Sequence, residues 1–202
     1  MLLALENSLP GELAHSKVMK DRKSILDKSL DLSSARKSAV LILVYPKEEE
    51  LYTVFIQRQV YEGVHSGQIG FPGGKSEETD NSLLDTALRE ANEEIGVFPK
   101  EIEVIGNLSP LYIPPSNFIV HPYIGVQNSL PEFIPEEKEV RQILEVPLKQ
   151  LIGKDKLIDT RVSISPELNI PVKAYQIDNH IIWGATCMIL TEFLDLWNSL
   201  NK

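Results

Sequence analysis

The sequence predicts a layered α/β domain. Dense apolar runs with the length of buried strands recur along the chain, starting with residues 38–45. Two segments carry apolar residues at helical spacing, residues 83–95 in the middle of the chain and residues 185–200 at its end. With 202 residues, 43% of them hydrophobic, the chain can form one domain with a sizeable core. Strands interleaved with helices in this way are typical of layered α/β architecture.

The first part of the chain contains a charged arm and two expected strands. Residues 17–30 are predicted to be helical, within an N-terminal arm (residues 1–36) that packs on the domain. Residues 38–45 form a continuous apolar run that fits a buried strand. Residues 52–58 fit a neighbouring strand, joined to the first by the polar turn at residues 47–50.

Further elements are expected after the central helix. Strands are predicted at residues 102–106, 119–126, 161–165 and 172–177. Residues 148–152 fit a short helix, and residues 185–200 close the chain with an amphipathic helix. Because the sequence contains no internal repeat and no convincing linker, residues 1–202 are predicted to form a single domain.

The helix predicted at residues 83–95 carries acidic groups along one side. Its apolar residues form one stripe, and Gly96 supplies a C-terminal stop. Its start is marked by good cap residues, Asp80, Asn81 and Ser82. At about 100° per residue, Glu90 and Glu94 lie about 40° apart, with Glu93 one step further round. These carboxylates therefore share one side of a rigid helix.

Clustered carboxylates on a helix favour a bound cation. Like charges at this spacing cost a few tenths of a kcal/mol per pair unless something positive lies among them. Magnesium fits, because it takes oxygen ligands from one or two carboxylates and adds water and substrate phosphates. Arg89 is placed to pair with Glu93 one turn later. A solvated acidic helix face is the alternative interpretation.

The loop before this helix, Phe71-Pro72-Gly73-Gly74, makes the prediction of a bound cation more specific. Proline fixes one backbone angle, while the two glycines turn tightly or let the backbone approach a ligand. An ordinary tight turn between strand and helix is the alternative. Loop and helix together are predicted to hold a hard divalent cation against a phosphate chain.

In these residues the chain resembles the Nudix hydrolase family, whose signature is Gly-x5-Glu-x7-Arg-Glu-U-x-Glu-Glu-x-Gly-U, with U a bulky apolar residue. The matching residues are Gly74, Arg89, Glu90, Glu93, Glu94, Gly96 and Val97. Position six after Gly74 is Asp80 instead of Glu, and the spacing to Arg89 is one residue longer than in the general signature. The resemblance implies an α/β/α sandwich, with a mixed sheet between helices, and Mg²⁺ or Mn²⁺ as cofactor.

The longer spacing is similar to that of the coenzyme A pyrophosphatase branch of the family. The residues in register with that branch are Arg58, Gly67, Phe71, Pro72, Gly73 and Gly74. Two residues depart from it, Gln59 in place of Ser and Gly63 in place of a second Arg. Because arginine forms a fork suited to phosphate, the missing Arg bears on substrate choice.

The resemblance implies a role for each candidate site residue. Glu90 and Glu94 are expected to be the principal metal ligands, and Glu93 a further ligand or a residue that orients water. Catalytic roles are expected for Glu93, for Arg89 as an orienting residue, and for Glu139 as first choice of general base within the cluster of Glu136, Glu137 and Glu139. A solvated loop is the alternative for that cluster. Residues expected to contact substrate are Arg58, His65, Gly73 and Gly74.

The leading hypothesis is hydrolysis of a pyrophosphate bond in a small nucleoside diphosphate derivative, with coenzyme A or its thioesters and other derivatives favoured. The resemblance implies adenosine 3′,5′-bisphosphate and 4′-phosphopantetheine as products. The second hypothesis is a Nudix hydrolase for ADP-ribose, NADH or oxidised nucleotides, which the residues at 59 and 63 support. The third is a non-catalytic nucleotide-binding regulatory domain, which has no need of the intact carboxylate set.

Composition excludes several other classes. The net charge of −9 argues against nonspecific binding of nucleic acid, which needs a basic surface. The single Cys187 excludes an internal disulfide and fits a reducing compartment. The start of the chain lacks the pattern of a signal peptide, and no apolar run approaches the ~18 residues of a membrane span. A cytoplasmic protein without membrane partners is therefore expected, and a homodimer stays open.

Overall fold

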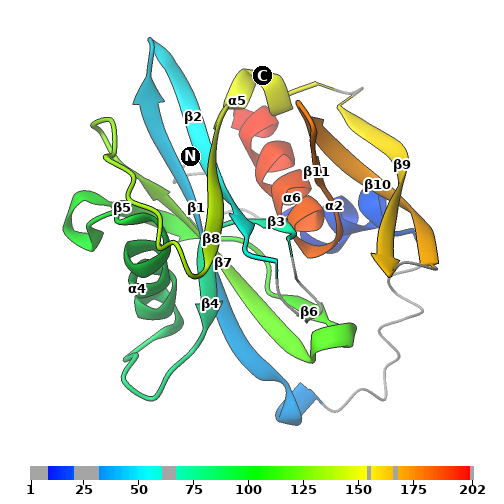
Figure 1. The fold of residues 1–202 in the computed structure, drawn as a ribbon, viewed down its shortest axis with the longest axis horizontal. Coiled ribbons are helices and arrows are strands. Elements are labelled where there is room, and N and C mark those ends of the chain that lie inside the picture. The colour runs from blue at the N-terminus through cyan, green and yellow to red at the C-terminus, as the bar shows by residue number, and fades with distance from the viewer. Residues whose placement is uncertain (1–8, 21–31, 61–66, 154–155, 166–167, 201–202) are drawn as a thin grey trace.

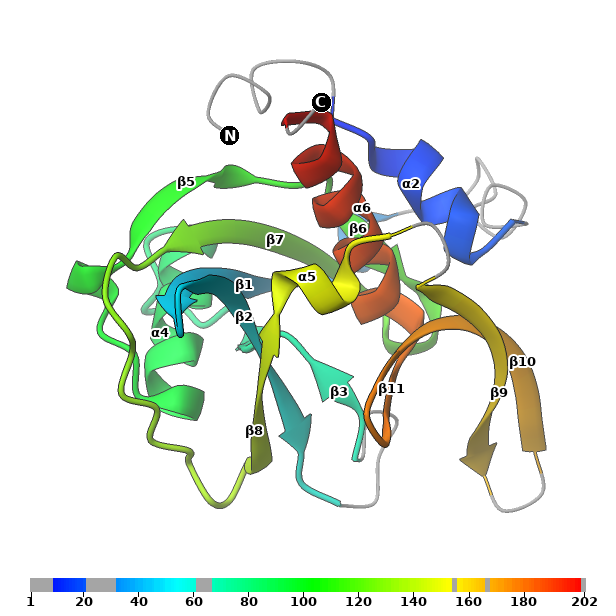
Figure 2. The same ribbon diagram turned by 90° about the horizontal axis from the view of Figure 1, so that it is seen from above.

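The computed structural model describes residues 9–20, 32–60, 67–153, 156–165 and 168–200 of the chain. A mixed β-sheet lies between helices, with α4 (Leu83–Ile95) on one face and α6 (Gly184–Leu200) on the other (Figures 1 and 2). This arrangement confirms the predicted α/β fold class.

The main sheet is organised around β1 (Arg36–Lys47). This strand runs antiparallel to β2 (Glu50–Arg58) and parallel to β7 (Phe118–Val126), which makes the sheet mixed. The β1–β2 turn places Glu48 and Glu49 at φ 51° and 63°, as a two-residue hairpin requires. The remaining strands of this sheet are β3 (Ile69–Gly70), β4 (Gly73–Lys75), β5 (Glu103–Asn107), β6 (Leu111–Ile113) and β8 (Val140–Pro147).

A second, three-stranded sheet lies beside α6 (Figure 2). It consists of β9 (Leu157–Ser165), β10 (Leu168–Ile177) and β11 (His180–Ile182), all antiparallel. The short helices in the described part of the chain are α5 (Leu148–Leu151), η1 (Leu32–Ser34), η2 (Pro99–Glu101) and η3 (Pro114–Ser116).

Two apolar cores fill the space on the two faces of the main sheet. Because successive side chains of a strand point to opposite faces, β1 serves both. Leu41 and Leu43 pack towards Ala91 of α4. Ile42 and Val44 belong to the other cluster, which includes residues of α6 such as Phe193. One core therefore fixes α4, the helix that carries the predicted metal ligands.

The N-terminal helix α2 (Gly11–Val18) is fastened to α6 by a buried contact between His15 and Glu192. His15 Nε2 lies 2.9 Å from Glu192 Oε2, and their side chains are 3% and 0% exposed. The backbone N–H groups of Gly11 and Ser109 both donate to Glu192 Oε1 at 3.1 Å. Burial by itself raises the pKa of Glu192, but the contacts with His15 and Ser109 hold it below its usual range.

Most predicted elements are present with small shifts of their ends, but the N-terminal helix is misplaced. The predicted helix 17–30 is wrong where the structure describes it, because α2 ends at Val18 and Met19 is extended. Residues 21–31 of that prediction lie outside the described residues. The helix starts after Pro10 instead, where the Glu192 carboxylate receives the N–H of Gly11. Such a long-range contact leaves no local pattern in the sequence.

Candidate active site

The segment Phe71–Gly74 is a loop only up to Pro72, whereas the prediction made all four residues a loop, because Gly73 and Gly74 begin β4 and pair with Val40 and Ala39 of β1. The Phe71 ring packs 4.7 Å from that of Phe55, and the carbonyl of Pro72 accepts from the Leu41 N–H at 2.8 Å. Gly73 has φ 151°, and a Cβ there would lie 2.6 Å from Val40 Cα. Only glycine therefore fits at position 73 without moving the backbone.

Gly74 leaves space for a side chain of α4. A Cβ at this position would lie 2.5 Å from both carboxylate oxygens of Glu90. The missing side chain thus leaves room for the Glu90 carboxylate directly against β4. Gly73 and Gly74 were predicted to contact substrate, and the structure places both beside the predicted metal ligands.

The helix α4 begins and ends as its sequence predicts. Ser82 is the N-cap, with its side chain accepting from the Asp85 N–H at 3.1 Å, and Gly96 ends the helix at φ 77°. Ala87, Ala91 and Ile95 are buried against the sheet. The carboxylates of the helix therefore project from an element whose rotation is fixed by packing.

Glu94 is the most deeply buried of these carboxylates, with 1% of its side chain exposed. Its Oε2 accepts the Gly73 N–H at 2.7 Å, and Arg58 Nη1 lies 3.4 Å from its Oε1. That Oε1 is buried and has no hydrogen-bond partner. Burial raises the pKa of Glu94 to about 7, which the Arg58 charge and the Gly73 N–H oppose, while Glu90 and Glu139 add to it.

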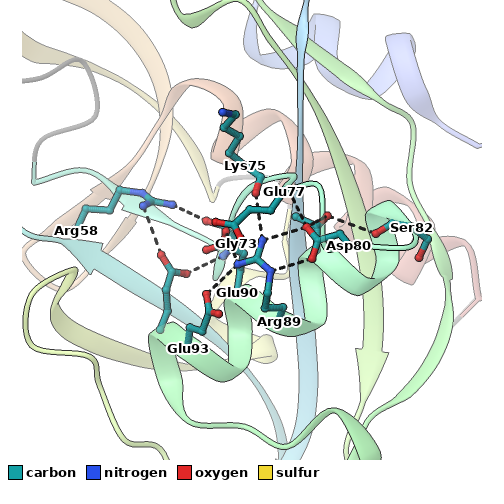
Figure 3. Close-up of polar contacts among 11 residues, drawn as sticks. Arg58, Gly73, Lys75, Glu77, Asp80, Ser82, Arg89, Glu90 and Glu93 are labelled. Carbon is teal, nitrogen blue, oxygen red and sulfur yellow. Dashed lines mark hydrogen bonds and ion pairs between the residues drawn. The ribbon is translucent and has the colours of Figure 1, made fainter.

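Arg58 links three elements. Its Nη2 donates to the Gly73 carbonyl at 2.8 Å while its Nη1 faces Glu94, so the end of β2 holds both β4 and the helix (Figure 3). This contact set fits a positioning role. The predicted contact of Arg58 with substrate stays a prediction, and His65 lies outside the described residues.

Arg89 is fully engaged by protein acceptors. It forms a fork with Asp80, with Nε 2.9 Å from Oδ1 and Nη2 3.1 Å from Oδ2. Its Nη1 donates to Glu90 at 3.1 Å and to Glu93 at 2.8 Å, and its Nη2 also donates to the Lys75 carbonyl (Figure 3). The predicted Arg89–Glu93 pair is thus present, as one part of a larger network.

Asp80, which was predicted only to mark the start of the helix and to replace the signature glutamate, is the main partner of Arg89. Its Oδ2 also accepts from the Glu77 N–H at 2.9 Å and from the Thr86 hydroxyl at 2.8 Å. The Arg89 guanidinium and these donors hold the pKa of Asp80 well below its usual range. The available signal was its place six residues after Gly74, where the Nudix signature has a glutamate.

Glu90 and Glu93 differ in their surroundings. The Glu90 side chain is 14% exposed, and burial raises its pKa while Arg89 opposes the shift. The Glu93 side chain is 55% exposed and lies at the outer edge of the helix. Within the described residues, no three His, Cys, Asp or Glu side chains converge on one point that could hold a metal ion. The predicted trio is therefore brought to one edge of the helix without converging.

Glu139 is brought to the same edge by a loop far along the chain. The Glu136 N–H donates to the Glu94 carbonyl at 3.0 Å, and the Gln59 N–H donates to the Glu139 carbonyl at 2.9 Å. A shallow pocket of about 360 Å³ lies there, and its lining consists of Glu93, Glu136, Lys138 and Glu139. The charge of Glu139 acts on both Glu90 and Glu94, so the predicted base lies near the predicted metal ligands.

The family of this chain follows from a direct match. Residues 35–168 match the NUDIX domain, which is more than half of the chain. The chain belongs to the Nudix family. The match spans β1, the segment Phe71–Gly74, α4 and the loop of Glu139, which together form the candidate site.

Bacterial Nudix proteins are similar to this chain in sequence. One relative is the uncharacterized Nudix hydrolase NudL of Pectobacterium atrosepticum, 33% identical over 160 residues that cover 78% of this chain and 80% of the relative. A second is the protein with the same name from Yersinia pestis, 32% identical over 156 residues, or 77% of this chain and 76% of that one. The chain is accordingly a Nudix hydrolase, an enzyme.

Solved structures share the Nudix fold with this chain. A MutT/nudix family protein from Enterococcus faecalis aligns with a TM-score of 0.55 at 17% identity, over 88% of this chain and 68% of that one. The MutT protein from Methanosarcina mazei aligns with a TM-score of 0.51 at 16% identity, over 81% of this chain and 94% of that one. At these identities the likeness bears on the fold alone.

Members of the Nudix family share a general type of substrate and cofactor. Nudix hydrolases act on small nucleotide substrates in which a nucleoside diphosphate is linked to another group, and they generally use divalent ions such as Mg²⁺ or Mn²⁺. Within the described residues, no helix has both the length and the apolar character that crossing a membrane requires.

The residues present fit a divalent cation. Carboxylate oxygens are the ligands that Mg²⁺ prefers. Glu90 supplies them in the space that Gly74 leaves, and Glu94 supplies them beside the Gly73 N–H. The buried Oε1 of Glu94 lacks a hydrogen-bond partner, and such an atom is costly unless something positive pairs with it. Arg58 at 3.4 Å supplies part of that compensation.

Proposed function

We propose that this Nudix hydrolase cleaves the pyrophosphate bond of coenzyme A or its derivatives in a reaction that depends on Mg²⁺ or Mn²⁺. The observation that carries the metal-dependent part is the buried Oε1 of Glu94, which faces the Arg58 charge but has no hydrogen-bond partner and lies beside Glu90, Gly73 and Gly74. The preference for coenzyme A rests on the resemblance to that branch of the family, in the spacing from Gly74 to Arg89 and in the residues before the loop.

Glu90 and Glu94 are the side chains that would hold the metal. When bound, a divalent ion screens phosphate oxygens, stabilises the leaving group and lowers the pKa of a bound water. The protein holds the two metal-binding carboxylates in place through contacts with neighbouring residues. Arg58 and the Gly73 N–H hold Glu94 in place, while Arg89 fixes Glu90.

Glu139 is proposed as the general base that accepts the proton of the attacking water. It lines the open pocket beside Glu93, where a water molecule has access, and its charge acts on both Glu90 and Glu94. Glu93 is proposed as a further metal ligand or as the residue that orients water, because it reaches the same pocket while paired with Arg89. His65, Gly73 and Gly74 are proposed to contact the substrate.

ADP-ribose, NADH or an oxidised nucleotide is the second candidate substrate class, and the departures from the coenzyme A pattern at Gln59 and Gly63 support it. The Gln59 side chain donates to the Glu137 carbonyl at 2.7 Å, so it anchors the loop of Glu139. Its place in the structure therefore serves the loop, where the coenzyme A branch has Ser. The third candidate, a non-catalytic regulatory domain, is set aside because the relatives are hydrolases by name.

A substrate screen tests the proposal. The wild-type protein is incubated with coenzyme A, ADP-ribose, NADH and 8-oxo-dGTP, each with Mg²⁺, with Mn²⁺ and with EDTA, and products are identified by mass. Coenzyme A should give adenosine 3′,5′-bisphosphate and 4′-phosphopantetheine only when metal is present. Faster cleavage of another compound would move the proposal to the second class, and equal cleavage in EDTA would refute the metal requirement.

A cytoplasmic location is also proposed, on the basis of the single free and buried Cys187. Cell fractionation tests the location. A homodimer stays a prediction, and light scattering coupled to gel filtration tests it.

A further inference from the structure

The pocket at the candidate site is mostly acidic, although the proposed substrate is an anion. Of the residues that line it, Glu93, Glu136 and Glu139 are acidic and Lys138 alone is basic. A pyrophosphate substrate brings further negative charge, and each like-charged pair at ~4 Å costs about 1 kcal/mol even in water. Binding therefore needs a positive group in the lining of the pocket itself, which does not include Glu90 or Glu94.

The two arginines of the site are poorly placed to supply that charge. Arg89 uses all of its nitrogens in contacts with Asp80, Glu90, Glu93 and the Lys75 carbonyl. Arg58 has both of its terminal nitrogens turned to Gly73 and Glu94. Neither arginine lines the pocket.

Lys138 is held at the pocket by its backbone. Its N–H faces Glu136 Oε1 at 3.3 Å, and the N–H groups of Glu139 and Val140 donate to the Glu136 carbonyl at 3.0 and 2.8 Å. On the other side, Gln59 donates to the carbonyls of the residues before and after Lys138. The loop thus cannot swing the lysine away without breaking these bonds.

The side chain of Lys138 is uncommitted. Within the described part of the chain, its ammonium group forms no ion pair and no hydrogen bond, whereas Lys47 and Lys149 pair with Glu145 and Glu50. An ammonium group on a flexible stem is a common phosphate ligand. The Lys138 ammonium group can therefore bind an incoming anion without first breaking a contact within the protein.

We propose that Lys138, in the lining of the pocket beside Glu93 and Glu139, binds a non-bridging phosphate oxygen of the substrate. This inference rests on the proposed function and adds a substrate-binding residue to it. Because the contact is with a phosphate present both before and during reaction, Lys138 contributes to binding of the ground state and transition state alike. Its loss should raise KM and leave kcat nearly unchanged.

Lys138→Gln tests the assignment, with Lys138→Arg as the conservative variant and Lys100→Gln as a control of equal charge change outside the pocket. Kinetics are measured on the best substrate of the screen. Separately, calorimetry measures binding of imidodiphosphate, a non-hydrolysable analogue, with and without Mg²⁺. Thermal unfolding checks that each variant is folded.

Lys138→Gln should raise KM about tenfold with kcat within about twofold, and weaken imidodiphosphate binding to the same degree. Lys138→Arg should restore most of the affinity, and Lys100→Gln should behave like wild type. Unchanged KM and imidodiphosphate affinity in Lys138→Gln, or a fall in kcat alone, would overturn the assignment. If the wild-type protein hydrolyses no pyrophosphate substrate, the proposed function fails, whereas the imidodiphosphate measurement still decides the role of Lys138.

Discussion

Replacing Glu94 by Gln should make the metal-free protein more stable while it abolishes turnover. The carboxylate is 1% exposed, and burial raises its pKa from 4.5 to about 7. A carboxyl group whose pKa is higher in the folded state destabilises the fold once both states are ionised. At 1.36 kcal/mol for each pKa unit, the ionised Glu94 costs about 3 kcal/mol at pH 8.

The sign of the pH dependence follows from proton binding. Between pH 4.5 and about 7 the folded chain keeps the Glu94 proton while the unfolded chain has lost it, so stability falls as pH rises. Below that window the carboxyl group is neutral in both states. The advantage of Glu94→Gln should therefore be small near pH 4.5 and grow to about 1–3 kcal/mol at pH 8, since Gln keeps the Gly73 contact but loses the Arg58 charge pair.

Urea unfolding in EDTA from pH 4.5 to 8, with steady-state kinetics in Mg²⁺, checks both halves of this prediction. Turnover should drop at least a hundredfold, the size expected when a principal metal ligand is lost. Glu93→Gln is the matched control, because its side chain is 55% exposed and its surface pair is worth at most about 1 kcal/mol. A stability difference for Glu94→Gln that stays constant across the pH range, or a destabilised variant at pH 8, would refute the reasoning.

Three further substitutions have distinct expected effects. Gly74→Ala places a methyl group 2.5 Å from the Glu90 oxygens, so activity should fall at least tenfold while urea unfolding changes by less than about 1 kcal/mol. Asp80→Asn weakens the fork with Arg89 and should cost about 2 kcal/mol at pH 7, a difference that shrinks as pH falls below about 4 in the same assay. His15→Ala removes the partner of Glu192 Oε2 while the Gly11 and Ser109 N–H groups stay on Oε1, and it should cost about 1–3 kcal/mol, whereas activity at 20 °C should persist.

The fold was predictable wherever local pattern and burial agree. The central helix matches its prediction at both ends, because a cap, an apolar stripe and a glycine all lie within one segment. The strands predicted at residues 38–45 and 52–58 are present as Arg36–Lys47 and Glu50–Arg58, because each is a local apolar run. By contrast, β8 (Val140–Pro147) was missed, since its burial is uneven and it ends in proline. Its pairing with β2 depends on residues some 90 positions earlier, as in Phe55 with Leu144.

The site was predictable in its residues more than in its contacts. The sequence identified Glu90, Glu93 and Glu94, and the structure brings Glu139 to the same edge. The sequence could not reveal that Arg58 reaches Gly73 and Glu94, because the contact joins two strands and a helix that only folding places together. For the same reason the fork of Asp80 was not foreseen.

The buried His15–Glu192 contact joins α2, near the start of the chain, to α6, near its end. It therefore bears on how short a folded fragment of this enzyme can be. Residues 35–168 carry the whole family match, yet α2 and α6 lie outside that range. Without them, Ile42, Val44 and Ile124 would face water, because Phe193 and its neighbours cover that side of the sheet. The minimal autonomous unit is thus longer than the region of homology, and trimming to the homologous borders should yield an insoluble polypeptide.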